Sequence, residues 1–204
     1  MASIHDILVE VARHLQLTGI ALALATMTGI PLGILITRER WLAAPVLAVI
    51  SVIYTIPSVA LLGFMIPLLG IGPKVAIVAL FLYALLPIVR NAYTGISQSD
   101  PSASEAARGM GMSETQVLAR VVLPQALPVL MAGVRTSAVL GVSVATLAAL
   151  VGARGLGKFV FEGIDMTNTR MILSGAIPIA VLALLVDTGL GLLERWITPR
   201  GLRR

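Results

Sequence analysis

Charged side chains are scarce in this chain, and cysteine is absent. Only 12% of the 204 residues are charged and 57% are hydrophobic, whereas a soluble domain carries about 25% charged residues. No charge occurs from Trp41 to Pro73, and about 20 consecutive apolar residues suffice for a helix to cross a bilayer. The composition therefore predicts an integral membrane protein.

The same shortages exclude several kinds of chemistry. Without cysteine there is no disulfide, thiolate metal site or cysteine nucleophile, and the two histidines, His5 and His14, precede the first apolar segment. We therefore expect no metal, no cofactor and no enzyme active site. The only lysines, Lys74 and Lys158, lie outside any Gly-x4-Gly-Lys-Ser/Thr pattern, so ATP must be bound by another chain.

Apolar runs between charges and turn signals predict an all-α bundle of about five membrane-spanning helices in one domain, residues 1–204. The expected spans are 17–37, 42–69, 74–91, 125–151 and 171–193, with a polar loop at 100–124. Pro57 removes a backbone hydrogen bond from the second span and should kink or break it. No signal-peptide cleavage pattern precedes the first span, which we expect to be retained.

The distribution of cations predicts the orientation in the membrane. If the N-terminus lies outside, nine cations fall in the inner connections and C-terminus and five fall outside, which the positive-inside rule favours. The inner cations are Arg38, Arg40, Arg90, Arg108, Arg120, Arg195, Arg200, Arg203 and Arg204, and the outer ones are Arg13, Lys74, Arg154, Lys158 and Arg170. The net charge of +5 is then a topology signal and not a nucleic-acid surface. The C-terminus and the loop at 100–124 are predicted to be cytoplasmic.

This loop carries two helix-start signals. Ser102 with Glu105, and Ser113 with Gln116, match the capping box, in which the serine oxygen accepts from a first-turn amide and the acid or amide side chain reaches back. The pattern predicts two short helices.

A bend is expected between them. Gly109 and Gly111 weaken a continuous helix, and they alternate with Met110 and Met112. Flexible methionine suits a knob that stays docked in a partner's groove. An ordinary amphipathic loop packed on the bundle is the alternative that these residues leave open.

The loop also resembles a known motif. Glu105-Ala-Ala, three residues, Gly111, nine residues and Val121-Val-Leu-Pro124 resemble the EAA loop of bacterial ABC importer permeases, whose pattern ends in Ile-x-Leu-Pro. The chain departs from that pattern by Val121 in place of Ile. Gly155-Leu-Gly157 is likewise similar to a sequence that often follows the fourth span of these permeases.

In that family the loop forms a coupling helix seated in a cleft of the ATPase subunit. The resemblance implies this role for Glu105, Ala106, Ala107, Gly109, Met110, Gly111, Met112, Leu123 and Pro124. Glu105 is expected to cap the helix and contact a basic ATPase residue, and Gly111 to provide the bend. Pro124 is expected to begin the fourth span, where its missing amide costs little.

The resemblance further implies a substrate class and partners. Residues 33–37, 55–64 and 84–95 are similar to osmoprotectant permeases, which import glycine betaine, choline or carnitine. Importers of methionine, phosphonates or sulfonates share the loop and remain the alternative. The implied partners are ATP-binding cassette ATPase subunits, a second identical or related permease subunit, an extracytoplasmic binding protein and the lipid of the bacterial inner membrane.

Arg135 and Asp187 are the charges expected inside the bilayer. They lie at similar depths in the fourth and fifth spans, and buried ionisable residues usually pair or face a cavity. We predict a structural salt bridge; a proton relay is the alternative, which an ATP-driven importer does not need.

Aromatic residues make up only 4% of the chain. Tyr54, Phe81 and Tyr83 are candidates for cation–π contact with a quaternary ammonium substrate, although helix packing is the more common role. Small residues at four-residue spacing permit close helix contact within the chain or between subunits; they are Gly29, Gly33, Gly133, Ser137 and Gly141.

Two other membrane classes fit less well. A passive channel leaves the loop at 100–124 without a purpose. A carrier driven by protons or sodium would need more helices, internal repeats and intramembrane acids.

Overall fold

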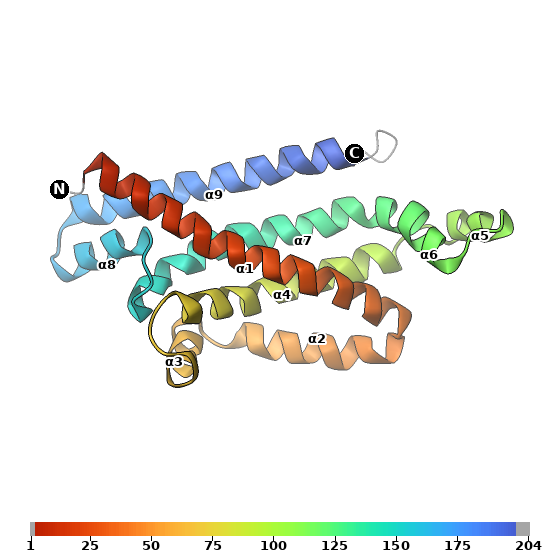
Figure 1. The fold of residues 1–204 in the computed structure, drawn as a ribbon, viewed down its shortest axis with the longest axis horizontal. Coiled ribbons are helices and arrows are strands. Elements are labelled where there is room, and N and C mark those ends of the chain that lie inside the picture. Colours follow the sequence, from red (N-terminus) through yellow and green to blue (C-terminus); the bar gives the residue numbers. More distant parts are fainter. Residues whose placement is uncertain (1–2, 199–204) are drawn as a thin grey trace.

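The computed structural model describes residues 3–198, and within these residues every regular element is a helix. The long helices run side by side along one axis (Figure 1). They are α1 (Ile4–Arg38), α2 (Arg40–Thr55), α4 (Pro73–Ser97), α7 (Leu123–Val144) and α9 (Thr169–Ile197). The shorter elements are α3 (Ser58–Leu69), α5 (Pro101–Gly109), α6 (Glu114–Val117), a π-helical turn η1 (Leu118–Val122), a 3₁₀ segment η2 (Ala145–Val151) and α8 (Gly157–Asp165).

The apolar helices confirm an all-α bundle of about five spans. Four helical stretches are long and apolar enough to cross a membrane: Ile4–Arg38, Pro73–Ser97, Glu114–Val151 and Thr169–Ile197. The pair α2 and α3 supplies a fifth if it counts as one broken span.

Several helices, α1, α4 and α9 among them, are longer than the predicted spans. α1 begins at Ile4, because Ser3 and Asp6 form a capping box at its start. α4 continues to Ser97, so Arg90, expected in a connection, lies within the helix.

The second span breaks at Pro57, as predicted. α2 ends at Thr55, α3 starts at Ser58, and their axes meet at 98°. Ile56 has the extended backbone that a following proline imposes. The hydroxyl of Tyr83 donates to the Ile56 carbonyl, so an acceptor freed by the break is satisfied within the protein.

The elements sort to two ends of the bundle (Figure 1). The last turn of α1, the first of α2, the last of α4, α5, α6 and the C-terminal part of α9 lie at one end, which we call the hairpin end. The start of α1, α3, α8 and the start of α9 lie at the other. The packed interior is centred on α4, which contributes eleven buried residues and packs between α1 and α7.

Small residues explain this close packing. A Cβ added to Gly29 would lie 2.8 Å from Ile88 Cγ2, and one added to Gly133 would lie 2.7 Å from Asn91 Cβ. A Cβ on Gly33 would overlap Ala92 Cβ. These three glycines therefore serve helix contacts within the chain.

Candidate functional site

The first helix of the 100–124 loop begins differently from the prediction. Its cap is Asp100, whose Oδ1 accepts from the backbone N–H of Ser102 at 2.9 Å and from its hydroxyl at 2.5 Å. These bonds lower the pKa of the Asp100 carboxyl. Pro101 occupies the first helical position, where no amide is needed. The capping box expected at Ser102 and Glu105 is therefore wrong, and Glu105 lies within α5 with an exposed side chain.

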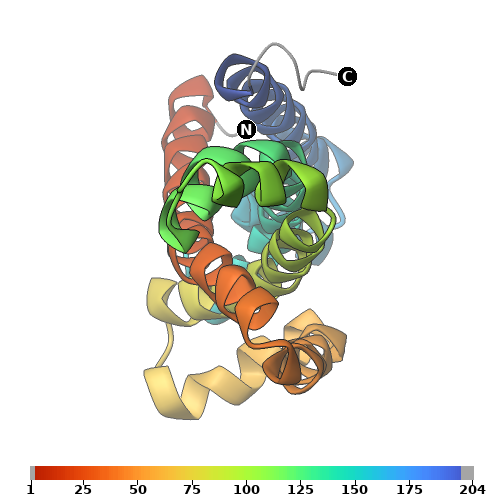
Figure 2. The same cartoon turned by 90° about the vertical axis from the view of Figure 1, so that its right-hand side faces the viewer.

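The second capping box forms as predicted. Gln116 N–H donates to Ser113 Oγ at 3.4 Å, and Ser113 N–H donates to Gln116 Oε1 at 2.9 Å. α5, the bend and α6 form a compact unit of residues 100–117, which we call the hairpin. Figure 2 looks onto it and shows that it lies across one end of the bundle.

The bend of the hairpin depends on Gly111. Its φ of +84° lies in the left-handed region that favours glycine. No atom lies within 4 Å of a Cβ placed there, so the constraint is conformational and not one of space. Met110 at the tip is 74% exposed, whereas Met112 is half-buried. Gly109 is the last residue of α5.

An ion pair closes the hairpin, and the sequence analysis missed it. Arg108 Nε donates to Glu114 Oε1 at 2.7 Å, and Arg108 Nη2 donates to Glu114 Oε2 at 3.2 Å. This two-point bond joins α5 to α6 across the bend, and it lowers the pKa of Glu114. Six residues separate the pair, a spacing that matches no helix-face rule. The opposite charges flanking a predicted bend were the available signal.

The hairpin has one buried and one free face. Ser104, Ala107 and Val117 are buried, and α5 packs on α6 and the π-helical turn, while Glu105, Ala106 and Met110 are exposed. A polar cleft of about 290 Å³ separates the hairpin from the ends of α1 and α4. Its lining includes Arg38, Ser99 and Glu105. Glu105 thus borders this cleft, and because Glu105 and Ala106 are exposed, the Glu-Ala of the EAA motif is accessible from outside the chain.

The end of the EAA motif forms the π-helical turn. Leu123 N–H donates to the Leu118 carbonyl, one residue further back than in an α-helix, and Pro124 has no N–H to donate. A continuous helical stretch runs from Glu114 to Val151. Pro124 therefore lies at the start of α7, as predicted, although the helix continues backward from it through the π-helical turn to Glu114.

Arg135 and Asp187 are in contact, and a third charge joins them. Arg135 Nε and Nη2 donate to the two carboxylate oxygens of Asp187 at 3.0 and 3.1 Å. Arg135 Nη1 donates to Glu194 Oε2 at 3.0 Å. Sequence reasoning missed Glu194, which lies seven residues after Asp187 and hence on the same face of α9. The position of this cluster within the bilayer stays a prediction.

The three aromatic candidates lie in packing positions. Tyr54 and Tyr83 stack edge to face with ring centroids 5.8 Å apart, and Phe81 packs against two of the apolar clusters. None of the three lines the small apolar cavity described next. Contact with substrate stays a prediction for all of them.

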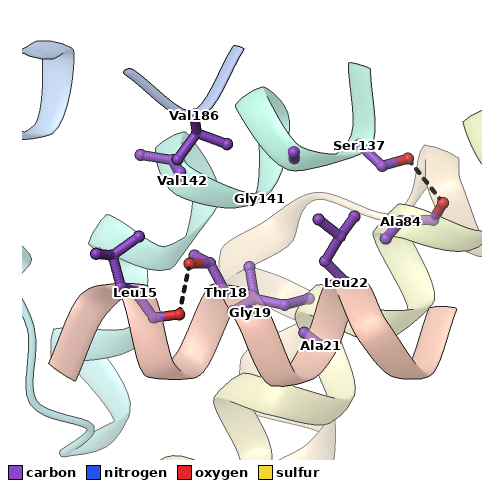
Figure 3. A pocket seen from close by; sticks show the side chains of 12 residues that line it. Leu15, Thr18, Gly19, Ala21, Leu22, Ala84, Ser137, Gly141, Val142 and Val186 are labelled. Carbon is purple, nitrogen blue, oxygen red and sulfur yellow. Dashed lines mark hydrogen bonds between the residues drawn. The ribbon is translucent and has the colours of Figure 1, made fainter. Parts of the chain in front are cut away.

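A small apolar cavity of about 80 Å³ lies among α1, α4, α7 and α9 (Figure 3). Gly19 and Gly141 line it, and nothing lies within 4 Å of a Cβ on either. The hydroxyl of Thr18 donates to the His14 carbonyl and that of Ser137 to the Ala84 carbonyl, each at 2.9 Å. These hydroxyls are therefore already engaged, and the cavity offers little for a polar ligand.

Gly155-Leu-Gly157 has a clear packing role. Gly155, with φ +154°, lies against the ring of His14, and Gly157 lies so close to the Thr146 carbonyl that no Cβ would fit. The buried His14 ring bonds the Val142 carbonyl through Nε2 at 2.9 Å, and because a carbonyl only accepts, Nε2 carries the proton. Among residues 3–198, no three histidine or acidic side chains gather closely enough to hold a metal ion.

Comparisons with known proteins agree with this architecture. The family model described as binding-protein-dependent transport system inner membrane component matches residues 29–200. The carnitine transport permease protein OpuCB of Listeria monocytogenes is 45% identical over 199 residues, which cover 98% of this chain and 91% of that protein. The osmoprotectant import permease protein OsmW of Salmonella typhimurium is 45% identical over 196 residues, covering 94% and 91%.

A solved structure shares the fold. The inward-facing MetNI methionine ABC transporter matches with a TM-score of 0.85 and 26% identity, covering 95% of this chain and 96% of that one. The EAA motif, the bundle and these likenesses lead to one conclusion: the chain belongs to the family of binding-protein-dependent transport system inner membrane components, and it is a multi-pass transport permease rather than an enzyme.

Proposed function

We propose that this chain is the permease of an ATP-driven importer of osmoprotectants that carry a quaternary ammonium group, such as glycine betaine, choline or carnitine. The observation that carries the proposal is 40–45% identity, over nearly the whole chain, to permeases named for carnitine, osmoprotectants and choline. The methionine transporter is much less similar, at 26% identity. Its shared fold makes import of another small solute the second candidate.

ATP hydrolysis belongs to separate subunits in this proposal. The hairpin supports it, because it lies at one end of the bundle with Glu105 and Met110 exposed (Figure 1). These residues contact the ATPase, and the ATPase moves the hairpin as it closes on ATP. The solute is delivered at the opposite end by an extracytoplasmic binding protein.

A second permease subunit completes the pathway. Two permeases of one Bacillus subtilis system, the glycine betaine/carnitine/choline transport proteins OpuCB and OpuCD, are 40% and 44% identical to this chain. These paired relatives support assembly with an identical or related partner.

The hairpin end faces the cytoplasm in this proposal. Among the described residues, five cations lie near each end of the bundle, and Arg90 in α4 adds a sixth on the side of the hairpin end. Arg200, Arg203 and Arg204 fall outside the described residues. Because the natural chain has no cysteine, Met110→Cys and Lys158→Cys give clean reporters. We expect an impermeant maleimide to label the Lys158→Cys variant in intact cells and the Met110→Cys variant only after lysis; the reverse pattern contradicts this orientation.

The function is tested by uptake of radiolabelled glycine betaine, choline and carnitine. The host lacks its own osmolyte importers and expresses the chain with its ATPase and binding protein. We expect ATP-dependent uptake that is lost in the Glu105→Ala/Gly111→Asp variant. An assembled complex that imports none of the three solutes would refute the osmoprotectant proposal and favour another solute.

A further inference from the structure

The half of α9 nearest the hairpin end has few apolar anchors. The buried residues of α9, Gly175 and Leu182, both lie in the other half of the helix. In the most apolar 18-residue stretch of α9 only 6% of the residues are buried, against 50% in the corresponding stretch of α4. From residue 183 to 197, most side chains are exposed or partly exposed.

Arg135 provides the strong attachment in this half. Asp187 and Glu194 are seven residues, or about 10 Å, apart along one face of α9, and the guanidinium bonds both. Gly191 lies between them, and a Cβ there would be 3.3 Å from Arg135 Cζ. The guanidinium therefore lies close against the helix backbone and is held at two points along it.

Two-point attachment differs physically from a single salt bridge. The two carboxylates leave α9 at backbone positions about 10 Å apart and converge on one planar guanidinium. They therefore hold α9 at two positions along its length, whereas a helix held at one position can pivot about it. The partner helix is α7, which follows the hairpin within one continuous helical stretch, Glu114–Val151. Arg135 lies about 27 Å along this stretch from Val117.

We propose that Arg135, Asp187 and Glu194 fasten α9 to α7, so that α9 follows the movement of the hairpin during transport. The proposal rests on the proposed importer function. Arg135 and Glu194 act as positioning residues and do not contact solute. A proton relay through Arg135 does not fit, because a guanidinium stays protonated in proteins.

The test measures whether α7 and α9 move together. Spin labels on Ala119→Cys, in the π-helical turn that leads into α7, and on Leu193→Cys in α9 occupy exposed positions near the hairpin end. They report the α7–α9 distance at that end in the assembled importer. Labelled chains are diluted with unlabelled ones, and the ATP-free and ATP-trapped states are compared. We expect the same narrow distance distribution in both states, and a broadened or shifted one in Glu194→Gln. This variant keeps the Arg135–Asp187 pair, so folding should survive.

Transport provides the second readout. We expect Glu194→Gln to lower solute imported per ATP hydrolysed by about threefold or more, a usual size for lost coupling. Arg135→Lys should behave similarly, because one ammonium does not reproduce the fork that reaches both acids. Lys158→Met, which removes the Lys158–Glu162 pair within α8, is the matched control and should change neither quantity.

Two results would overturn the proposal. One is a wild-type α7–α9 distance that itself changes between the two states. The other is a Glu194→Gln importer with wild-type distances and wild-type uptake per ATP. The label distances do not depend on the solute, so a failure of the osmoprotectant assignment would appear separately, as wild-type importer that takes up none of the three osmolytes.

Discussion

The contacts of α4 and those of α9 represent two ways of joining helices in a membrane protein. α4 meets α1 and α7 through glycines that bring backbones close together. The hairpin-end half of α9 meets α7 through one guanidinium and two carboxylates. Lipid tails are as apolar as leucine, so apolar burial alone does not drive helices together there. The difference indicates a fixed core around α4 and a charge-held helix at its edge.

Replacing Arg135, the cation that holds α9 to α7, should have the largest effect on the stability of the permease. We expect Arg135→Met to lower the free energy of unfolding by about 3 kcal/mol, because it leaves Asp187 and Glu194 unpaired. This is the low end for such pairs, since the two acid side chains are 39% and 22% exposed. Thermal unfolding of the purified permease measures the loss.

A variant in which all three charges are neutralised shows whether charge or packing accounts for the lost stability. Arg135→Met combined with Asp187→Asn and Glu194→Gln removes the uncompensated charges, so it should recover part of the stability lost in Arg135→Met. An equally unstable triple variant would show that packing around Arg135, and not charge, holds α9.

Filling a glycine contact should have the next largest effect. Gly33→Ala is expected to cost about 2 kcal/mol, because the new methyl overlaps Ala92 and forces α1 away from α4. Gly19→Ala on the same helix is the matched control: it meets open space and should be neutral or stabilising by about 0.5 kcal/mol. Equal melting temperatures for the two variants would contradict the close-packing account.

The helix cap of α5 should matter less than either kind of helix contact. We expect Asp100→Ala to weaken α5 measurably, through loss of the bonds to Ser102. Glu105→Ala should leave α5 intact, because Glu105 is exposed and is not its cap. Amide hydrogen exchange in α5 distinguishes the two, and faster exchange in Glu105→Ala than in Asp100→Ala would restore the original capping prediction.

The exposed Arg108–Glu114 pair should give the smallest effect on stability, because ion pairs between exposed side chains contribute little. The pKa of Glu114 is lowered in the folded hairpin, so this contribution is present above the ordinary glutamate pKa of about 4.3 and is lost as pH falls below it. The protection of the hairpin amides against hydrogen exchange, relative to an unfolded peptide at the same pH, should therefore fall on acidification. Arg108→Ala should reduce that pH dependence and leave the part that comes from Asp100, whose carboxyl pKa is also lowered; an unchanged pH dependence would contradict the role of the pair.

Local chemistry allowed part of this structure to be predicted from sequence. A proline restricts its own backbone and that of the preceding residue, so the break at Pro57 followed directly. Ser113 and Gln116 satisfy a short-range rule and form their box. Arg135 and Asp187 were predicted to lie at equal depth in antiparallel spans and therefore to pair, and the two residues are in contact.

The errors arose where two local signals competed or where contacts crossed a bend. Asp100 followed by Pro101 is a stronger helix start than Ser102, because proline fixes the first helical residue. Arg108 and Glu114 meet only because Gly111 reverses the chain. Glu194 joins Arg135 through tertiary packing of α9 on α7, which no spacing rule within one helix reveals.

The π-helical turn changes which side of the helix faces the bundle before and after it. Val117 and Ala126 are both buried, yet nine residues at about 100° each would place them on opposite sides of a regular α-helix. One extra residue in the turn removes about 100° of that offset, which brings both side chains toward the bundle. The turn therefore sets the rotation of the hairpin relative to α7, and with it the direction in which Glu105 and Met110 face outward. Deleting one residue between 118 and 122 should rotate the whole hairpin by more than a quarter turn while leaving its own bonds unbroken.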